Sequence, residues 1–441
     1  MKKIPLIIGL GKTGVSLAKY LARSEESLYV LEQSPQDKYL KELKDLDVEY
    51  ILNPEISERT FKLISRIYPS PGVSPEHEAF QYAKNLNIPS QTDIDLYLKN
   101  SQSYNILVTG TNGKTTTASM LEHLLRGFFK DKSISVIGNI GKPVLDSLDK
   151  KLLDIAIIEI SSFQIESSSR LNCDIGILLN VREDHIDRHK TFSTYKALKK
   201  RVLKDAKKRI TSDLLLKANT ARTRFIDYKR FYSDEEFLKN PIFETWPIHD
   251  INNLKAALTA VDIINNKATF LPKDKRAFLD EAFKIISSFK KQPHRFELIE
   301  NNSGVIYVND SKATNIDATL KAIESSRKLN KEGRIFLICG GDLKGQTLRY
   351  ERFRSTPTFT SPFEEIEKCF IYGKDKELLN DKLSNLTNCI CCEDLDSAYS
   401  LAEQESEKGD LILLSPGCSS TDMFSDYRKR GDRFKELIQR T

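Results

Sequence analysis

Residues 109–116 have the composition of a phosphate-binding loop. They are Thr-Gly-Thr-Asn-Gly-Lys-Thr-Thr, and they lie between an apolar run at 106–108 and a helix-like stretch at 118–125. Backbone N–H groups of a glycine turn, together with those at the start of a helix, form a cradle for phosphate oxygens. Lys114 can add a positive charge for the β- and γ-phosphates, and the Thr115 hydroxyl can ligate Mg²⁺. The segment therefore predicts a site for a phosphate-bearing ligand with its metal ion.

Acidic and histidine side chains follow two other predicted strands. The apolar segment 154–160 delivers Glu159 near its end, where a parallel sheet places ligands, and a carboxylate there can hold the same Mg²⁺. Residues 180–189 (Asn-Val-Arg-Glu-Asp-His-Ile-Asp-Arg-His) come directly after the strand 175–179. Their spacing does not match the His-x-His-x-Asp-His pattern of zinc hydrolases. We expect His185 to serve a second Mg²⁺ or a substrate phosphate.

A second glycine turn lies near the start of the chain. Residues 9–14, Gly-Leu-Gly-Lys-Thr-Gly, follow a predicted strand at 6–8, and Glu32 ends the next strand at 28–31. The pattern fits the dinucleotide fingerprint, in which an acidic residue about 20 positions further on binds a ribose. Because such a turn serves any diphosphate at a helix N-terminus, it predicts a pyrophosphate site rather than NAD in particular.

Polar loops follow three predicted strands in the last third of the chain. They are residues 309–315 (Asn-Asp-Ser-Lys-Ala-Thr-Asn), 340–344 (Gly-Gly-Asp-Leu-Lys) and 415–420 (Ser-Pro-Gly-Cys-Ser-Ser). The carboxyl ends of parallel strands meet at one edge of a sheet, so the three loops together predict a small-molecule site. Lys199 lies in a basic helix predicted for 193–208, where composition alone favours a solvated, charged face.

Short apolar runs and amphipathic stretches alternate along the chain and must position these residues. This alternation is typical of parallel sheets with helical crossovers. Domain boundaries are expected at the polar stretch 95–104 and where the helical pattern breaks at 290–293. The fold class is therefore predicted as α/β in three domains: Rossmann-like at 1–94, a central phosphate-loop domain at 95–291 and Rossmann-like at 292–441. Further strands are expected at 135–137, 155–158, 305–308, 335–338, 369–372, 389–391 and 411–414, with two helices between 252 and 289.

Composition excludes several classes of protein. The 441 residues carry 68 Lys+Arg and 62 Asp+Glu, a net charge of +6 with no separate basic block, so charge does not indicate a nucleic-acid partner. The seven cysteines are scattered apart from Cys389, Cys391 and Cys392, which have no nearby histidine and are expected to be buried thiols. No apolar run approaches the ~18 residues of a membrane span. We expect a soluble, cytoplasmic protein without membrane insertion, and a monomer.

Taken together, these motifs resemble those of the Mur ligases, the ATP-dependent amino-acid-adding enzymes of peptidoglycan synthesis. The family-wide signals are residues 110–115, Glu159 within Glu-Ile-Ser-Ser-Phe-Gln, and residues 180–188. The members that add D-glutamate carry the further signals found here at 293–297 (Pro-His-Arg-Phe-Glu), 309–315 and 414–424. The resemblance runs from residue 9 to about residue 434 and so covers essentially the whole chain.

The resemblance implies a role for each matching residue. The matches to ATP-binding positions are Gly110, Thr111, Asn112, Gly113, Lys114, Thr115, Thr116, Asn253, Arg295 and Asp310. The matches to positions for the nucleotide-sugar substrate or D-glutamate are Gly11, Lys12, Thr13, Asn139, His185, Thr314, Lys344, Ser420 and Tyr427. Two Mg²⁺ ions are implied at Thr115, Glu159, His185 and Lys199, with Lys199 carbamylated, and the catalytic set is Lys114, His185, Lys199 and Lys312.

The activity implied is addition of D-glutamate to UDP-N-acetylmuramoyl-L-alanine through an acyl phosphate, which requires closure of the domains on one another. Alternatives are a related Mur-type or folylpolyglutamate-type ligase, an NAD oxidoreductase that uses residues 9–14 with Glu32, and a non-catalytic nucleotide-binding module. The segment 310–315 disfavours another Mur-type or folylpolyglutamate-type ligase, and the phosphate loop disfavours the NAD oxidoreductase. The non-catalytic module is disfavoured because Lys114, Glu159, His185 and Lys312 are all present.

Four residues depart from the family pattern. Asp250 follows His249 where the family often has Asn, Gln33-Ser34 stand where Thr-Arg is usual beside the uracil, and Tyr427 replaces a common Phe. We expect the contacts with the nucleotide and with uracil to differ locally from those of relatives.

Overall fold

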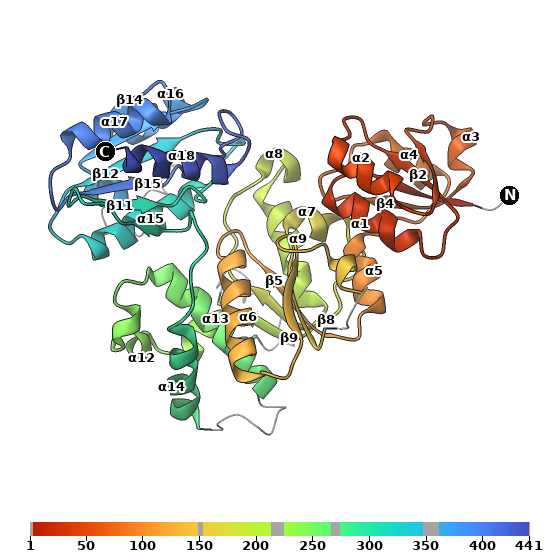
Figure 1. Ribbon diagram of the computed structural model, residues 1–441, viewed down its shortest axis with the longest axis horizontal. Coiled ribbons are helices and arrows are strands. Elements are labelled where there is room, and N and C mark those ends of the chain that lie inside the picture. Colours follow the sequence, from red (N-terminus) through yellow and green to blue (C-terminus); the bar gives the residue numbers. More distant parts are fainter. Residues whose placement is uncertain (1–2, 149–152, 213–224, 266–273, 347–360, 441) are drawn as a thin grey trace. The chain divides into compact units, whose positions relative to one another are not determined.

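The protein folds as two compact units built on three sheets. The computed structural model describes residues 3–148, 153–212, 225–265, 274–346 and 361–440 (Figure 1). Each unit is assembled from three chain segments. The first unit is formed by Met1–Val181, Lys196–Tyr232 and Leu254–Ile286, and the second by Arg182–Tyr195, Ser233–Asn253 and Ser287–Thr441.

The first sheet has the strand order β3-β2-β1-β4, and its strands are parallel. The strands are β1 (Ile4–Ile8), β2 (Ser27–Leu31), β3 (Glu49–Leu52) and β4 (Ile64–Pro69). The helices between and after them are α1 (Lys12–Leu21), α2 (Asp37–Lys44), α3 (Glu58–Phe61) and α4 (Glu78–Asn85). The turn between β1 and α1 is the predicted glycine turn, so it lies at the carboxyl edge of this sheet.

The second sheet places the phosphate loop in its centre. Its order is β6-β7-β5-β8-β9, again parallel, so the ends of β7 and β8 flank the end of β5. The strands are β5 (Tyr104–Thr109), β6 (Ile134–Gly138), β7 (Ile155–Glu159), β8 (Cys173–Leu178) and β9 (Ala206–Thr211). The helical elements of this part are α5 (Asp93–Asn100), α6 (Lys114–Phe128), η1 (Val144–Ser147), α7 (Ser162–Ser167), α9 (Phe192–Lys204), α11 (Tyr228–Phe231), α13 (Ile248–Asn265) and α14 (Lys275–Ile286).

The third sheet has the order β10-β11-β15-β12-β13-β14, with β10 antiparallel and the other strands parallel. The strands are β10 (Glu297–Ile299), β11 (Ile306–Asn309), β12 (Ile335–Gly340), β13 (Lys368–Tyr372), β14 (Asn388–Cys391) and β15 (Leu411–Leu414). The remaining helical elements are α8 (Ile186–His189), α12 (Asp234–Leu238), η2 (Pro241–Phe243), α15 (Ile316–Leu329), η4 (Pro362–Glu365), α16 (Lys376–Leu383), α17 (Leu395–Glu405) and α18 (Tyr427–Gln439). Because β11, β15 and β12 are neighbours, the three predicted polar loops lie side by side.

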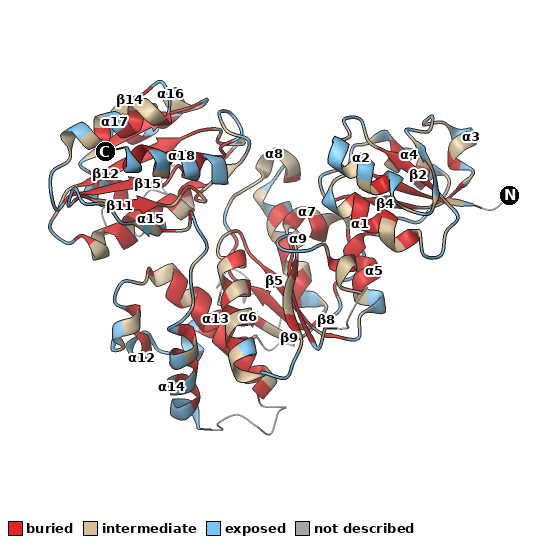
Figure 2. Cartoon of the chain, viewed as in Figure 1, coloured by how far each residue is buried: buried red, intermediate tan, exposed pale blue. Residues whose placement is uncertain are grey.

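The central strands of all three sheets are buried, as Figure 2 shows. Strands covered on both faces by helices read as continuous apolar runs, which is why the sequence pattern located them. The predicted α/β fold is therefore confirmed, with two parallel sheets and a third in which β10 alone among its strands is antiparallel. The pair of helices expected between 252 and 289 is present as α13 and α14, with residues 266–273 outside the described part of the chain.

Helix α5 covers the first part of the polar stretch at 95–104 and buries Leu96 and Tyr97. Two local expectations were wrong. The basic helix ends at Lys204 rather than at 208, and strand β9 begins at Ala206. All seven cysteines are free, but Cys391 is exposed because it lies on the edge strand β14. Within the described residues, no helix is long and apolar enough to cross a membrane.

Candidate active site

The phosphate loop joins the central strand β5 to helix α6. Gly113 has φ +84°, a left-handed conformation that turns the chain into the helix and that a side chain would disfavour. No side chain hydrogen-bonds to cap this helix start, and its first turn carries no acidic residue. The N–H groups at the helix start and the helix dipole therefore make an electropositive end, which suits a phosphate.

Lys114 and Thr115 stand on the first turn of α6, as the sequence predicts. The Lys114 Nζ donates to the carbonyl oxygens of Gly110 at 2.9 Å and Thr111 at 2.8 Å, so the ammonium lies against the loop. Thr115 is buried at 6% exposure. Every predicted phosphate-loop residue from Gly110 to Thr116 is thus gathered in one turn of the first unit.

Asn180 is a residue of this site that the sequence analysis did not assign. It follows β8, and its side chain pairs with the backbone of Asn112 in both directions: Oδ1 accepts from the N–H at 3.0 Å and Nδ2 donates to the carbonyl at 3.0 Å. The N–H of Thr111 also donates to the Asn180 carbonyl at 3.0 Å. The side chain therefore clamps the phosphate loop. An asparagine directly after the strand next to β5 was the available signal.

Glu159 is the last residue of β7 and is 1% exposed. Its Oε1 accepts a hydrogen bond from Asn139 Nδ2 at 2.7 Å. Its Oε2 is buried and has no hydrogen-bond donor among the described residues. A buried carboxylate oxygen without a donor is costly unless a cation compensates it. Glu159 is therefore not a surface residue, and its carboxylate fits a metal ligand, as the sequence predicts.

A magnesium ion would need further oxygen ligands at this point. Within the described ranges, no three His, Cys, Asp or Glu side chains are grouped so as to hold a metal ion. Mg²⁺ commonly takes one or two protein oxygens together with substrate phosphates and water, so Glu159 and the Thr115 hydroxyl are a sufficient protein contribution. The donor set therefore fits Mg²⁺ bound with a nucleotide rather than a closed protein cage.

Lys199 lies on α9 and is buried at 1% exposure, so the interpretation as a solvated basic face is wrong. Its Nζ donates to the Gly110 carbonyl at 3.0 Å and to Thr109 Oγ1 at 3.4 Å. Lys199 is 85 residues beyond Lys114 in the sequence, and helix α9 brings its amine to the base of the phosphate loop. The hydrophobic periodicity of the helix did not indicate this position.

The first glycine turn has the close packing that its fingerprint requires. A Cβ on Gly14 would lie 2.0 Å from the Gly9 carbonyl oxygen, so only glycine lets α1 start this near β1. Lys12 and Thr13 form the first turn of α1 after Gly11. The Glu32 carboxylate accepts from the N–H groups of Leu10 at 2.7 Å and Ser34 at 3.0 Å. It holds the turn itself, which disfavours the NAD interpretation.

In the second unit, the three polar loops are bonded to one another at the carboxyl edge of the third sheet. The N–H groups of Asp342 and Ser419 donate to each other's carbonyls at 3.0 and 2.8 Å. Ser415 Oγ donates to Asp310 Oδ2 at 3.1 Å, and the Phe296 N–H donates to Asp310 Oδ1 at 3.1 Å. Burial raises the pKa of Asp310 to about 7. The three loops are therefore contiguous at this edge, as the sequence predicts.

Tyr427 begins helix α18 beside the loop that carries Lys312. The Lys312 Nζ lies 4.6 Å from the centre of the Tyr427 ring, and the Arg428 guanidinium carbon lies 5.1 Å from it. Two cations against one aromatic ring create a positive surface suited to an anionic substrate. Of the other predicted residues, Ser420 is buried, whereas Thr314 and Lys344 are half-buried.

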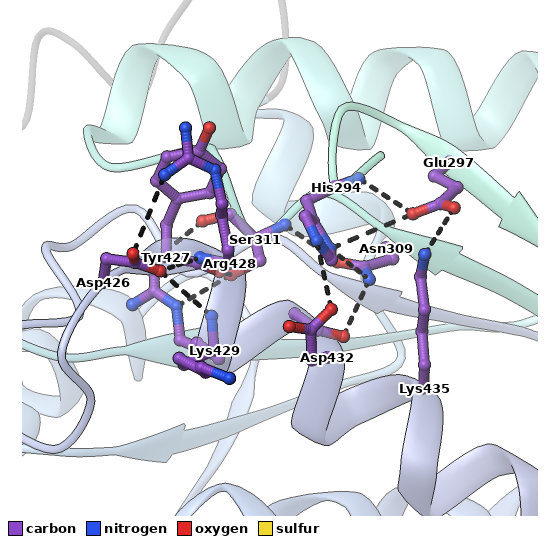
Figure 3. A network of polar contacts seen from close by, with 12 residues as sticks. His294, Glu297, Asn309, Ser311, Asp426, Tyr427, Arg428, Lys429, Asp432 and Lys435 are labelled. Atoms are coloured by element: carbon purple, nitrogen blue, oxygen red, sulfur yellow. Dashed lines mark hydrogen bonds and ion pairs between the residues drawn. The ribbon is translucent and has the colours of Figure 1, made fainter. Parts of the chain in front are cut away.

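A second set of contacts fixes the segment at 293–297 to α18. Figure 3 shows His294 directed at Asn309 and Asp432, with Nδ1 3.1 Å from Asn309 Nδ2 and Nε2 3.4 Å from Asp432 Oδ1. Glu297 Oε1 accepts from Lys435 Nζ at 2.6 Å. These bonds set the position from which Arg295 extends.

Arg430 is the other residue that sequence reasoning missed. It is fully buried, and its Nη2 donates to the carbonyls of Ser311 at 2.8 Å and Cys418 at 3.0 Å. The guanidinium thereby joins two of the three loops. Its position inside an otherwise charged terminal helix hid it among exposed basic residues.

The predicted site residues are distributed over both units. The phosphate loop, Glu159, Asn139 and Lys199 belong to the first, and so do Gly11, Lys12 and Thr13. The second contains the remaining predicted residues, His185, Asn253, Arg295, Asp310, Lys312, Thr314, Lys344, Ser420 and Tyr427. His185 has φ +54° and precedes the short helix α8, and its Nε2 lies 3.8 Å from Asp184 Oδ2.

Comparison with known proteins agrees with this arrangement. Models of the Mur ligase MurD-like N-terminal domain, the Mur ligase middle domain, and the Mur ligase glutamate ligase domain match residues 3–90, 108–229 and 294–418. The chain is 32% identical to the UDP-N-acetylmuramoylalanine–D-glutamate ligase of Marinobacter nauticus over 98% of its own length and 97% of that protein. It is 31% identical to the ligase of the same name from Buchnera aphidicola, over 99% of this chain and 98% of that protein.

Solved structures share the fold. The MurF ligase of Thermotoga maritima in complex with ADP aligns with a TM-score of 0.57 and 15% identity, covering 100% of this chain and 97% of that one. The MurC ligase of the same organism aligns with a TM-score of 0.55 and 14% identity, covering 99% of each chain. With full-length relatives above 30% identity, and with three domain models matched in order, the chain belongs to the Mur ligase family.

Proposed function

We propose that this protein is an ATP-dependent ligase that adds D-glutamate to UDP-N-acetylmuramoyl-L-alanine, releasing ADP and phosphate. The observation that carries the proposal is similarity over 98% of the chain to D-glutamate ligases, with the phosphate loop, Glu159 and Lys199 gathered at one sheet edge. The reaction belongs to cytoplasmic peptidoglycan precursor synthesis, and through cell-wall biogenesis it serves cell shape and division.

The reaction proceeds through an acyl phosphate. The substrate carboxylate attacks the γ-phosphorus of ATP and ADP leaves. The D-glutamate amine then attacks the acyl carbon, and the resulting tetrahedral species expels phosphate and leaves an amide. Lys114 moves from the loop carbonyls to the phosphates and offsets negative charge during transfer, while the N–H groups at the start of α6 bind phosphate oxygens.

Two Mg²⁺ ions are part of the proposal. Thr115 and Glu159 would hold the first, while His185 and Lys199 would contribute to the second. When bound, Mg²⁺ lowers the repulsion between the phosphates and the attacking carboxylate. Lys199 would contribute as a carbamate, formed when its neutral amine adds CO₂ and loses a proton, because an ammonium cannot ligate a cation.

The substrates are assigned to the remaining predicted residues. Gly11, Lys12 and Thr13 bind the diphosphate of the nucleotide sugar at the start of α1, with Asn139 and His185 also near this substrate. Asn253, Arg295 and Asp310 contact ATP. Lys312, Thr314, Lys344, Ser420 and Tyr427 surround D-glutamate, whose two carboxylates suit the cations around the Tyr427 ring. The domain bounds 1–94, 95–291 and 292–441 and a monomeric state complete the proposal.

The test is phosphate release from ATP and Mg²⁺ by the purified protein. We expect release only when UDP-N-acetylmuramoyl-L-alanine and D-glutamate are both present, and none with L-glutamate. Lys114→Ala should lower kcat at least a thousandfold, whereas Lys130→Ala, a change at an exposed lysine just after α6, should not. Release with another amino acid would keep the ligase chemistry and replace the substrate; a fully active Lys114→Ala variant would refute the assignment of the loop.

A further inference from the structure

Ser16 and Asp146 join the two sheets of the first unit, and the proposed reaction uses neither side chain directly. Ser16 lies on α1, four residues after Lys12, and is 3% exposed. Its Oγ donates to Asp146 Oδ1 at 2.6 Å, across 130 positions of sequence. Asp146 lies in η1, the short helical element that follows β6 of the second sheet. One hydrogen bond therefore connects a helix of the first sheet with an element of the second.

Apolar packing surrounds this hydrogen bond. The element η1 packs against both α1 and α5. The buried side chains here form one cluster that combines both sheets, with Val15 from α1, Ile94 from α5, Val144 and Leu145 from η1, and Leu107 from β5. All of them belong to the first unit. Because Ser16 is buried, water has little access to its hydroxyl, and Asp146 is the acceptor that satisfies it.

The element that carries Asp146 comes directly after Asn139, a proposed contact of the nucleotide sugar. The chain between them is a closed turn, in which the Gly138 N–H donates to the Lys142 carbonyl at 2.9 Å. Asn139 is held on its other side by Glu159. The Glu159 carbonyl accepts from the Asn139 N–H at 2.9 Å, and the Glu159 Oε1 accepts from the Asn139 Nδ2 at 2.7 Å. The position of η1 and the position of Asn139 are therefore linked.

Ser16 is equally close to the other proposed contacts of this substrate. Gly11, Lys12 and Thr13 form the start of α1, and Ser16 lies about one helical turn after Lys12. The hydrogen bond from Ser16 therefore sets the diphosphate-binding turn of the first sheet relative to Asn139 on the second. A ligand that contacts both turns binds more tightly when their spacing is set beforehand, because less ordering remains to be done on binding.

We propose that the Ser16–Asp146 hydrogen bond is a positioning device for the nucleotide-sugar site, which aligns the diphosphate-binding turn of the first sheet with Asn139 of the second. This inference rests on the proposed function, because it needs a substrate that contacts both turns. Both residues act through the position of these turns and take no part in the chemical step. ATP binding does not depend on this hydrogen bond, because Asn180 on the far side of β5 holds the phosphate loop.

The experiment measures kcat and the KM of each substrate in the phosphate-release assay, and the Kd of UDP-N-acetylmuramoyl-L-alanine by calorimetry without ATP. We expect Ser16→Ala and Asp146→Ala each to raise KM and Kd for the nucleotide sugar about fivefold, the effect of losing one hydrogen bond. The kcat and the KM for ATP should be unchanged. The double variant should bind no more weakly than either single variant, because both substitutions remove the same hydrogen bond.

Two further variants separate positioning from a general loss of structure. Asp146→Asn keeps an acceptor oxygen for the Ser16 hydroxyl, so its KM for the nucleotide sugar should remain near that of wild type. Ser147→Ala is the matched control, because Ser147 is the next residue of η1 and its Oγ donates to the Val144 carbonyl at 2.6 Å, within the same element. This control should also leave the KM for the nucleotide sugar unchanged.

Unchanged KM and Kd for the nucleotide sugar in Ser16→Ala and Asp146→Ala would overturn the inference. So would an equal rise in KM for all three substrates, or additive losses in the double variant. If Ser16→Ala does not fold, as judged by circular dichroism, the comparison of Asp146→Ala with Asp146→Asn decides the matter. Failure of the proposed function is distinct, since wild-type protein would then release no phosphate with this nucleotide sugar and D-glutamate.

Discussion

At the residue scale, the proposed chemistry uses side chains whose polar atoms are buried. Glu159 and Lys199 are each 1% exposed, and both lie at the edge of the sheet that carries the phosphate loop. Burial of a charge is expensive unless a partner or a ligand compensates it. We propose that the buried Glu159 carboxylate and the Lys199 amine, which donates to the Gly110 carbonyl and the Thr109 hydroxyl, complete their coordination when substrate binds.

The role of Lys199 can be tested by chemical rescue. Lys199→Ala removes the nitrogen that would carry a carbamate, and we expect kcat to fall at least a hundredfold because a metal-binding oxygen is lost. Short carboxylic acids such as acetate, which supply a carboxylate in place of the carbamate, should restore part of the activity in a concentration-dependent way. Lys204→Ala, an exposed lysine at the end of the same helix, should be indistinguishable from wild type. Absence of rescue would leave the carbamate without support.

At the element scale, strands and their connecting turns carry the site, and packing between elements fixes the turns. The phosphate loop is held by β8 through Asn180, and the glycine turn of the first sheet is held by Glu32 at the end of β2. In both cases a polar side chain from the neighbouring strand binds loop backbone, so the cradle is formed before a phosphate arrives.

Asn180→Ala should therefore weaken ATP binding while the fold persists. The two lost hydrogen bonds leave loop N–H and C=O groups to find other partners, a cost of about 1–3 kcal/mol. We expect KM for ATP to rise about tenfold. The measurement is steady-state kinetics with varied ATP, with Asn100→Ala at an exposed position on α5 as control. An unchanged KM would show that the loop holds its shape unaided.

Helix α5 carries a buried acid whose charge costs stability. Asp93 occupies its first turn, its Oδ1 has no donor among the described residues, and burial raises its pKa to about 6. An unfolded chain has an ordinary pKa near 3.8, so the folded state holds an extra proton between about pH 4 and pH 6. The protonated carboxyl group therefore contributes to the free energy of unfolding at low pH, and this contribution is lost as the pH rises through about 6.

Asp93→Asn should remove this pH dependence. The wild-type free energy of unfolding should fall, relative to the variant, by about 2 kcal/mol between pH 4.5 and pH 7.5. Urea denaturation followed by circular dichroism at the two pH values measures it. Asp47→Asn, at an exposed position, should show the wild-type pH dependence. Parallel stability profiles for wild type and Asp93→Asn would contradict the assignment of the buried charge.

At the scale of the whole molecule, each unit is assembled from separate stretches of chain. Residues 182–195 and 233–253 belong with the C-terminal segment, although the family-model match for the middle domain includes the first of these stretches. Three successive domains in the sequence therefore do not correspond one to one with the compact units. A cut at any single position would divide at least one unit between the two products.

We predict a monomer in solution, with a mass near the 50.4 kDa of the chain. The exposed large apolar side chains among the described residues are separate in the sequence and number five, Ile51, Phe231, Leu298, Leu378 and Met423, which does not indicate an extensive apolar interface. Sedimentation velocity at several concentrations measures the mass. A concentration-independent species of twice this mass would overturn the prediction.

The sequence alone determined the parallel α/β architecture and the positions of the main motifs. Buried parallel strands are local apolar runs, and phosphate loops are local patterns of glycine, lysine and threonine, so both are readable without tertiary information. The three polar loops after β11, β12 and β15 were also expected to meet, because parallel strands end at a common edge.

Tertiary structure decided what no local pattern encodes. Lys199 had the composition of a surface helix but is buried beside Gly110, because the crossover after β8 turns that face toward the sheet. Asn180 and Arg430 became visible only through the loops they bond, at separations of 68 and 119 residues. Asp250, in the sequence a departure from the family pattern, forms an ion pair with Lys291 at 2.7 Å, a partner 41 positions further along the chain. Which polar groups pair over long sequence separations depends on how helices and strands pack against one another. The spacing of residues along the chain does not specify that packing, so these parts of the site could not be predicted from the sequence.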